Sequence, residues 1–187
     1  MRTHMTADRI FDKTTPETIG SDDEYVGCTF ISCDFSDKTI TARFDDCRFL
    51  SCNLSLARMN GTMRDTLFSD CKLTGADFSE LDRFSNAITF EKSRLDYAVF
   101  ASVAVKRIRF RDCRLTEASF DNADMTGAVF ERCDLGRASF RGANLTGADF
   151  STAFGFAIDP ATCRMKNTVF SESGLRGLVA HLDIEII

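Results

Sequence analysis

The chain has 187 residues, of which 44% are hydrophobic, and a formal net charge of −5. This length is typical of one domain, and this composition can form a core. No apolar run approaches the length of a membrane span, and the opening residues, MRTHMTADRIFDK, lack the apolar segment of a signal peptide. We therefore expect a single cytoplasmic domain that contacts no membrane and, given its negative charge, binds no nucleic acid directly.

Residues 1–20 show no repeat. They are polar and include Pro16 and Gly20. Chain ends of this kind are commonly poorly ordered unless something ties them down. We therefore predict a loosely ordered leader over residues 1–20 that covers or caps the domain that follows.

Residues 21–171 carry a five-residue repeat. A large apolar residue, the centre of each repeat, recurs at every fifth position from Phe90 to Phe150, and all eight cysteines stand two positions before such a centre. The remaining slots are mostly polar. A period of five fits neither the 3.6-residue period of a helix nor the two-residue period of a strand, so it indicates a solenoid of very short strands and turns.

Centres that are four repeats, or twenty residues, apart carry similar side chains, as Phe90, Phe110 and Phe130 do. Four repeats therefore make one coil, and each coil has four faces. The N-terminal half follows the same rule once slips at 40–44, 59–68 and 78–90 are allowed. The predicted fold is an all-β solenoid of about seven coils. One face of it would stack phenylalanines as a core ladder: Phe30, Phe49, Phe68, Phe90, Phe110, Phe130, Phe150 and Phe170.

The cysteines occupy an inward slot, which favours reduced thiols that pack as small hydrophobic side chains over disulfides. Pairs such as Cys28 and Cys33 have a spacing that zinc sites can use. A structural zinc nevertheless needs four ligands that converge on one point, whereas stacked thiols run in a column. Both histidines, His4 and His181, lie outside the repeats. We predict no metal site and no cofactor.

No motif of a hydrolase, a phosphate-binding loop or a metalloprotease is present in the sequence. The candidate acids are outward Asp and Asn residues directly before a centre, such as Asp77, Asp134, Asn144 and Asp149. Because this slot recurs throughout the repeat, its side chains are better explained as caps of the turn backbone. We therefore predict that the protein is not an enzyme and has no catalytic residue.

The repeat stalls over GFAIDPAT, where a bulging loop is expected, and resumes at 163–165 and 168–170. Residues 172–187 are predicted to form a closing helix, capped by Ser171 or Ser173, and an apolar tail. Their apolar side chains predict a two-fold homodimer, with a monomer and a folded-back cap as the alternative. The expected interface contains Leu175, Leu178, Val179, Leu182, Ile184 and Ile186.

Charge is unevenly distributed. Residues 1–87 hold 15 acidic and 10 basic side chains, whereas residues 88–187 hold 13 of each. The acidic residues that could face a partner are Asp22, Asp23, Glu24, Asp45, Asp46, Glu80 and Asp82. A basic band follows at Lys106, Arg107, Arg109, Arg111 and Arg114. We interpret the band as a solvated face with Glu91 and Asp112 nearby, because no aromatic platform for nucleic acid accompanies it.

Phrases such as CTFISCDF, CKLTGADF, CDLGRASF and ANLTGADF resemble those of the pentapeptide-repeat proteins over roughly residues 25–170. The resemblance implies a right-handed quadrilateral β-helix with a C-terminal capping and dimerisation helix. The chain is similar to members that protect DNA gyrase and topoisomerase IV from quinolones or peptide toxins by imitating duplex DNA. The long projecting loops of some of those members are missing, and the insertion between Ser79 and Thr89 is the one candidate for such a loop.

The resemblance therefore implies a DNA-mimicking rod whose partner is gyrase or topoisomerase IV. The alternative is an interaction scaffold whose protein partner is not a topoisomerase. A gyrase supercoiling assay distinguishes the two, because the scaffold would leave supercoiling and its inhibition unchanged.

Overall fold

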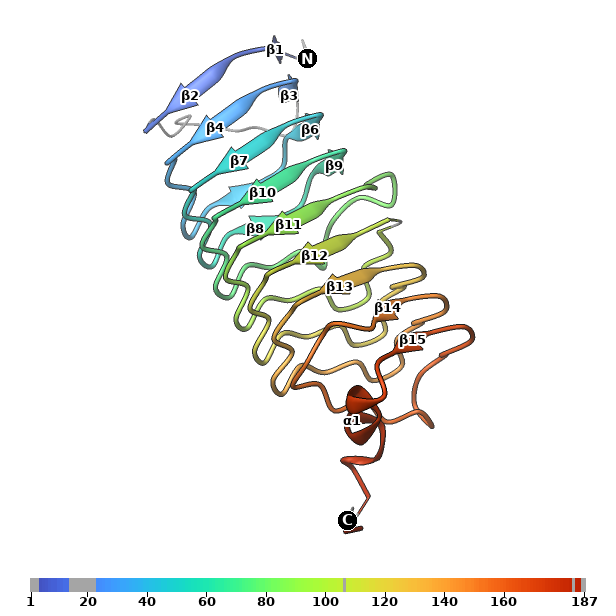
Figure 1. Ribbon diagram of the computed structural model, residues 1–187. Coiled ribbons are helices and arrows are strands. Elements are labelled where there is room, and N and C mark those ends of the chain that lie inside the picture. The colour runs from blue at the N-terminus through green and yellow to red at the C-terminus, as the bar shows by residue number, and fades with distance from the viewer. Residues whose placement is uncertain (1–3, 14–22, 106, 183, 186–187) are drawn as a thin grey trace.

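The computed structural model describes residues 4–13, 23–105, 107–182 and 184–185. The chain winds into a rod of stacked coils, in which equivalent short strands run parallel and side by side (Figure 1). This arrangement confirms the β-solenoid predicted from the five-residue repeat. Within the described ranges, no helix has the length and apolar character needed to cross a bilayer.

Two faces of the rod are parallel sheets. The first face is a four-stranded sheet made of β1 (His4–Ala7), β3 (Asp23–Val26), β6 (Arg43–Asp45) and β9 (Thr62–Arg64). The second face is a nine-stranded sheet along the whole rod. Its strands are β2 (Ile10–Asp12), β4 (Thr29–Ile31), β7 (Arg48–Leu50), β10 (Leu67–Ser69), β11 (Thr89–Glu91), β12 (Arg109–Arg111), β13 (Val129–Glu131), β14 (Asp149–Phe150) and β15 (Val169–Phe170).

The third and fourth faces are ladders made mainly of single bridges. The third face pairs Asp34, Asn53, Lys72, Arg94, Arg114, Asp134 and Phe154 in consecutive coils. The fourth face begins with β5 (Thr39–Ile40) and β8 (Arg58–Met59) and continues through Asp77, Val99, Ser119 and Ser139. Because the four faces follow one another around each coil, the first face lies opposite the third.

The core is a set of columns, of which the phenylalanine column of the second face is the longest. The eight predicted ladder residues stack in strand register, from Phe30 on β4 to Phe170 on β15. Neighbouring rings lie 4.6 to 5.3 Å apart and within 17° of parallel. A second aromatic column, Phe78, Phe100, Phe120 and Phe140, meets the first edge to face. Aromatic pairs favour both geometries.

The slips in the repeat change coil length without changing the columns. The coil from Phe30 to its partner Phe49 is shorter than a regular coil of four repeats, and the coil from Phe68 to its partner Phe90 is longer. The longer coil holds an inserted loop at 79–84. Ser85 then takes an inward position, where its hydroxyl accepts a hydrogen bond from the Met63 amide at 3.0 Å.

The prediction of a separate leader is wrong for residues 4–12. These residues form β1 and β2, which pair with β3 and β4. Phe11 stacks on Phe30 at 4.9 Å and 7°, so one aromatic side chain extends the phenylalanine column by a further layer. The solenoid therefore begins before residue 21, and its second sheet has nine layers where about seven coils were expected. Residues 14–20 of the predicted leader lie outside the described ranges.

The C-terminal end of the core is closed by Phe156 and a helix that is shorter than predicted. A 3₁₀ turn, η1 (Ser173–Leu175), leads into α1 (Arg176–Val179). The Ser171 hydroxyl accepts a hydrogen bond from the Gly174 amide, but Glu172, rather than Ser171 or Ser173, occupies the N-cap position of η1. The Ile158 amide donates to the Gly177 carbonyl at 3.0 Å, which ties α1 to the bulging loop before it.

Candidate functional site

The outward Asp and Asn residues cap the turns. Oδ1 of Asp77 accepts a hydrogen bond from the backbone amide of Ser79 at 2.9 Å. Asp134, Asn144 and Asp149 make the same bond to the residue two positions on, at 2.8 to 3.2 Å. These are the hydrogen bonds predicted from the sequence. They give the side chains that were considered as candidate acids a structural role in the turns.

The cysteines are free thiols. Seven of the eight are buried, and Cys163 is half-buried. Their S–H groups donate to backbone carbonyls, as Cys52 does to Phe30 at 3.3 Å. Burial raises the pKa of the Cys47 thiol to about 12, which disfavours the thiolate that binds metals and acts as a nucleophile. In the part of the chain that the structure describes, no three His, Cys, Asp or Glu residues are grouped as a metal site would require.

Several of the predicted acidic residues gather on the N-terminal half of the first face. Glu24 on β3, Asp45 on β6 and Asp82 in the inserted loop line one cavity of about 300 Å³. We call this surface the first-face patch, and it comprises Asp23, Glu24, Asp45, Asp46 and Asp82. Asp23 precedes Glu24 on β3, and Asp46 is exposed in the turn after β6. Of the other two predicted residues, Glu80 is exposed in the inserted loop, and Asp22 lies outside the described ranges.

Cations interrupt the acidic patch. Arg43 lies opposite Glu24 in the strand register, and Arg64 lies opposite Asp45. Nη1 of Arg64 is 4.0 Å from Oδ2 of Asp45, and both side chains are about half exposed. An ion pair of this kind contributes at most about 1 kcal/mol. The patch is therefore a surface of mixed charge with more acidic than basic side chains. The acidic clusters in the sequence did not reveal this mixture, because Arg43 and Arg64 lie beside the carboxylates only when the coils stack.

An exposed aromatic residue borders the same cavity. Phe84, in the inserted loop, is 56% exposed, and the guanidinium carbon of Arg83 lies 5.0 Å from its ring centroid. The Phe84 amide donates to Oδ1 of Asp82 at 2.8 Å, which fixes the loop beside the carboxylates. Phe84 is a surface residue that the repeat pattern missed, since it falls in the slip between Phe78 and Phe90. The sequence did contain a signal for this surface residue, because Phe84 is an aromatic residue that does not fit the five-residue register.

Arg111, in the basic band, pairs with carboxylates in both neighbouring coils, and Arg132 outside the band pairs with Asp112. Nε of Arg111 lies 2.8 Å from Glu131, and Nη1 lies 3.4 Å from Glu91. Arg132 holds Asp112 with two hydrogen bonds at 2.6 and 2.8 Å. The hydrogen bonds from Arg132 lower the pKa of the Asp112 carboxyl, and the hydrogen bond from Arg111 lowers the pKa of the Glu131 carboxyl. Both Arg111 partners stand one full coil away from it along the chain, so the coil period itself predicts this network.

The rest of the band differs from one residue to the next. Nε of Arg114 lies 2.8 Å from the buried Asp96. Arg107 and Arg109 border a shallow pocket that Asp65 and Glu91 also line. Lys106 lies outside the described residues. The band is therefore a mixed-charge face rather than a continuous cationic track.

The C-terminal segment presents apolar side chains to solvent. Leu175, Leu182 and Ile184 are exposed, whereas Leu178 packs against the core. Val179 is half-buried. The predicted interface is therefore divided between a part that caps the core and a part that faces outward, and Ile186 lies outside the described residues. The exposed part is available to a second copy.

These surfaces are suited to binding. The described residues with outward charges either cap turns, pair across coils or stand in open, solvated patches. The cavity of the first-face patch is bordered by a rigid sheet, so it can hold partner side chains at fixed spacing. The repeating layers set that spacing at about 4.8 Å along the rod.

Comparisons with known proteins agree with this architecture. A model of the pentapeptide repeat region matches residues 68–140. Among solved structures, the chain is similar to a trypsin-treated variant of QnrB1, a plasmid-mediated fluoroquinolone resistance protein, with 19% identity, 100% coverage of both chains and a TM-score of 0.66. A search among curated proteins gives no match.

A second similar structure comes from a protein with a different role. HetL is a pentapeptide repeat protein involved in heterocyst differentiation regulation in the cyanobacterium Nostoc sp. strain PCC 7120. It is 14% identical to this chain, over 93% of this chain and 87% of HetL, with a TM-score of 0.56. At such identities both likenesses concern the fold, and function has to be argued from the surface.

Proposed function

We propose that this chain, of which residues 68–140 match a model of the pentapeptide repeat region, is a non-enzymatic, protein-binding solenoid that binds DNA gyrase or topoisomerase IV and protects the enzyme from inhibitors. The observation that carries this proposal is the first-face patch. It places Glu24, Asp45 and Asp82 around one cavity on a rigid parallel sheet. The likeness in fold to QnrB1, a fluoroquinolone resistance protein, over the full length of both chains is compatible with a role in drug protection.

Electrostatics explain how such a patch would act. A topoisomerase binds duplex DNA in a cationic groove, and carboxylates held at regular spacing along a rod can occupy that groove in place of phosphates. Stacked layers supply regular spacing with little loss of conformational freedom on binding. Arg43 and Arg64 weaken the field of the patch, so we expect the acidic turn residues, led by Asp46, to contribute most of the attraction.

The exposed C-terminal leucines extend the proposal to a homodimer. A two-fold symmetric enzyme presents two equivalent halves of its DNA-binding groove, and a two-fold rod can occupy both. Leu175, Leu182 and Ile184 form the apolar contact in this arrangement. Burial in the dimer also removes exposed apolar side chains from solvent.

A gyrase supercoiling assay with and without ciprofloxacin tests the function. The purified protein should restore supercoiling in the presence of the drug. The double variant Asp45→Asn/Asp46→Asn should lose this protection, because it removes two patch carboxylates while Asn still tolerates the positive φ of 50° at position 46. A matched control is Asp12→Asn/Asp37→Asn, which changes net charge equally and includes another positive-φ turn residue.

Protection by the parent and the control, but not by the patch variant, is the expected result. Absence of any effect of the parent protein at high excess over gyrase would refute the proposed partner.

A second candidate function is an interaction scaffold for a protein that is not a topoisomerase. The pairing of Arg111 with Glu91 and Glu131 favours it, because a mixed-charge face is a poor imitation of DNA. The structural likeness to HetL, which has a regulatory role, is compatible with it. The scaffold should bind its partner without changing supercoiling, so the same assay separates the two functions.

A further inference from the structure

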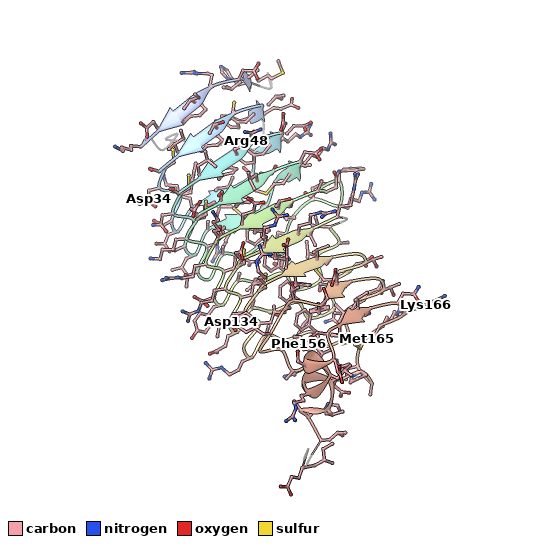
Figure 2. The ribbon with its side chains drawn as sticks, viewed as in Figure 1. Asp34, Arg48, Asp134, Phe156, Met165 and Lys166 are labelled. Atoms are coloured by element: carbon pink, nitrogen blue, oxygen red, sulfur yellow. The ribbon has the colours of Figure 1, made fainter. Side chains whose placement is uncertain are left out.

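The third face carries a column of cations on the side of the rod opposite the first-face patch. Lys72, Arg94 and Arg114 are bridged directly in three consecutive coils. Asp34 and Asp134 belong to the same column and lie along one edge of the rod, while Lys166, on the first face, lies on the other (Figure 2). Between these two aspartates, the column consists of Asn53 and then the three cations.

Stacking of like charges is unfavourable. Consecutive layers are about 4.8 Å apart, and like charges directly opposite one another on neighbouring strands destabilise a sheet. Arg114 is compensated, because its Nε lies 2.8 Å from the carboxylate of the buried Asp96. Among the described residues, no side-chain hydrogen bond or ion pair involves Lys72 or Arg94, and both side chains are exposed.

The aspartates of the column do not neutralise these cations. Oδ1 of Asp34 accepts hydrogen bonds from Ser36 and from the Asn53 amide group. Oδ1 of Asp134 accepts from the Gly136 amide at 3.0 Å. Both carboxylates are thus engaged at their own turns, two or more coils from Arg94. The middle of the third face consequently offers positive charge to an external partner.

An apolar ridge lies at the adjacent corner. Leu56, Gly75 and Tyr97 occupy equivalent turn positions in consecutive coils and have positive φ values of 59°, 68° and 61°. Leu56 and Tyr97 are 58% and 56% exposed. Leu56 also covers Gly75, since a Cβ added there would lie 2.7 Å from its Cδ2.

These two side chains are unusual for their positions. A positive φ is unfavourable for residues other than glycine and is least unfavourable for Asn and Asp. Other described turns with positive φ place glycine, small polar or charged residues there, with Ala87 as the small apolar case. Leu56 and Tyr97 are the large apolar ones in the described ranges, and both fall on this corner. Backbone strain combined with solvent exposure points to a functional demand on the side chain.

We propose that the third face, through Lys72, Arg94, Arg114, Leu56 and Tyr97, binds an acidic protein segment that carries apolar or aromatic side chains beside its carboxylates. The cation column pairs with the carboxylates, and the ridge packs against the apolar side chains. A protein segment fits better than nucleic acid, because Tyr97 supplies only one base-stacking platform on this face. The surface is separate from the first-face patch, so both can be occupied together.

Fluorescence anisotropy with a labelled random copolymer of glutamate and tyrosine tests this surface directly. The parent protein should bind the copolymer, and added salt should weaken binding. The charge reversal Lys72→Glu/Arg94→Glu should weaken it at least about tenfold. The control Arg58→Glu/Arg164→Glu reverses two exposed arginines on the fourth and first faces, so it changes net charge equally and should retain binding within about twofold.

A second variant separates binding from folding. Leu56→Asn/Tyr97→Asn keeps side chains that tolerate positive φ, so its melting temperature should be no lower than that of the parent. Its affinity for the copolymer should nevertheless fall about tenfold. Should the charge reversal fail to fold, Lys72→Gln/Arg94→Gln replaces it, with the same expectation for binding.

Three results would overturn the proposal. The first is equal binding of the copolymer by the parent and both third-face variants. The second is equal weakening by the control variant, which would mean that only net charge matters. The third is tighter binding of single-stranded oligothymidylate than of the copolymer, since that would make the face a nucleic-acid site.

Discussion

Replacement of Phe110 by alanine perturbs the centre of the phenylalanine column. The Phe110 ring is fully buried and stacks on Phe90 at 5.1 Å and on Phe130 at 5.0 Å. It also meets Phe100 and Phe120 edge to face at 5.5 and 5.9 Å. The substitution removes all four ring contacts, and the ladder hydrogen bonds above and below hold the layers apart, so the cavity cannot collapse.

The expected cost follows from this geometry. Replacement of a core phenylalanine by alanine typically destabilises a protein by about 3–5 kcal/mol. For a chain of this length each kcal/mol lowers the melting temperature by about 2–4 °C, which predicts a decrease of about 6–20 °C. Thermal unfolding followed by circular dichroism measures it. A matched control is Arg111→Ala on the same strand, whose exposed ion pairs contribute at most about 1 kcal/mol each.

The result that refutes the reasoning is a Phe110→Ala protein that melts within about 2 °C of the parent. A control that is destabilised more than Phe110→Ala would do the same, because it would place the stabilising contacts on the surface of the second face. Cooperative unfolding of the whole rod is expected in both proteins, because each coil is stabilised by its neighbours.

Three further predictions concern other parts of the rod. Gly61→Ala should cost at least about 2 kcal/mol in urea unfolding, because the new Cβ would lie 1.9 Å from the Ala42 carbonyl oxygen; an unchanged midpoint would contradict the close packing of Gly61, just before β9, against Ala42. Thiol titration of the native protein at pH 8 should modify the half-buried Cys163 first, with the other seven thiols reacting only on unfolding; equal rates for all eight would refute the buried columns. Leu175→Glu/Leu182→Glu should convert a homodimer to a monomer with unchanged β-type circular dichroism; light scattering that shows an unaltered dimer would place the interface elsewhere.

The columns of the core are determined by the sequence itself. Each repeat carries its own inward centre, and a coil of four repeats brings like centres together, so the stacking of Phe90, Phe110 and Phe130 follows from counting residues. The same counting applies to outward slots. It indicates that Arg111 meets Glu91 and Glu131, and that Arg94 lies beside Arg114.

The ends of the rod were decided by tertiary packing. Residues 4–12 contain one visible centre, Phe11, and a single aromatic residue has no periodicity to detect. A further layer is favourable there because Phe11 can stack on the face of the Phe30 ring that would otherwise end the phenylalanine column. The closing helix is short for a similar reason. Gly177 lies so close to Phe156 that an added Cβ would be 2.4 Å from its carbonyl oxygen, so the core end rather than helix propensity sets where α1 lies.

The surfaces depend on both levels. The sequence determines which residues point outward, because the inward and outward slots alternate within each short strand. Which of those charges are neutralised is decided by the layers, since the slips at 40–44, 59–68 and 78–90 change the number of residues between stacked neighbours. Arg43 and Arg64 thereby enter the first-face patch, whereas Lys72 and Arg94 are stacked without a carboxylate among the described residues. The net charge of a surface depends on which residues are neighbours in space. Those neighbours can be predicted from the sequence only where the five-residue repeat is unbroken.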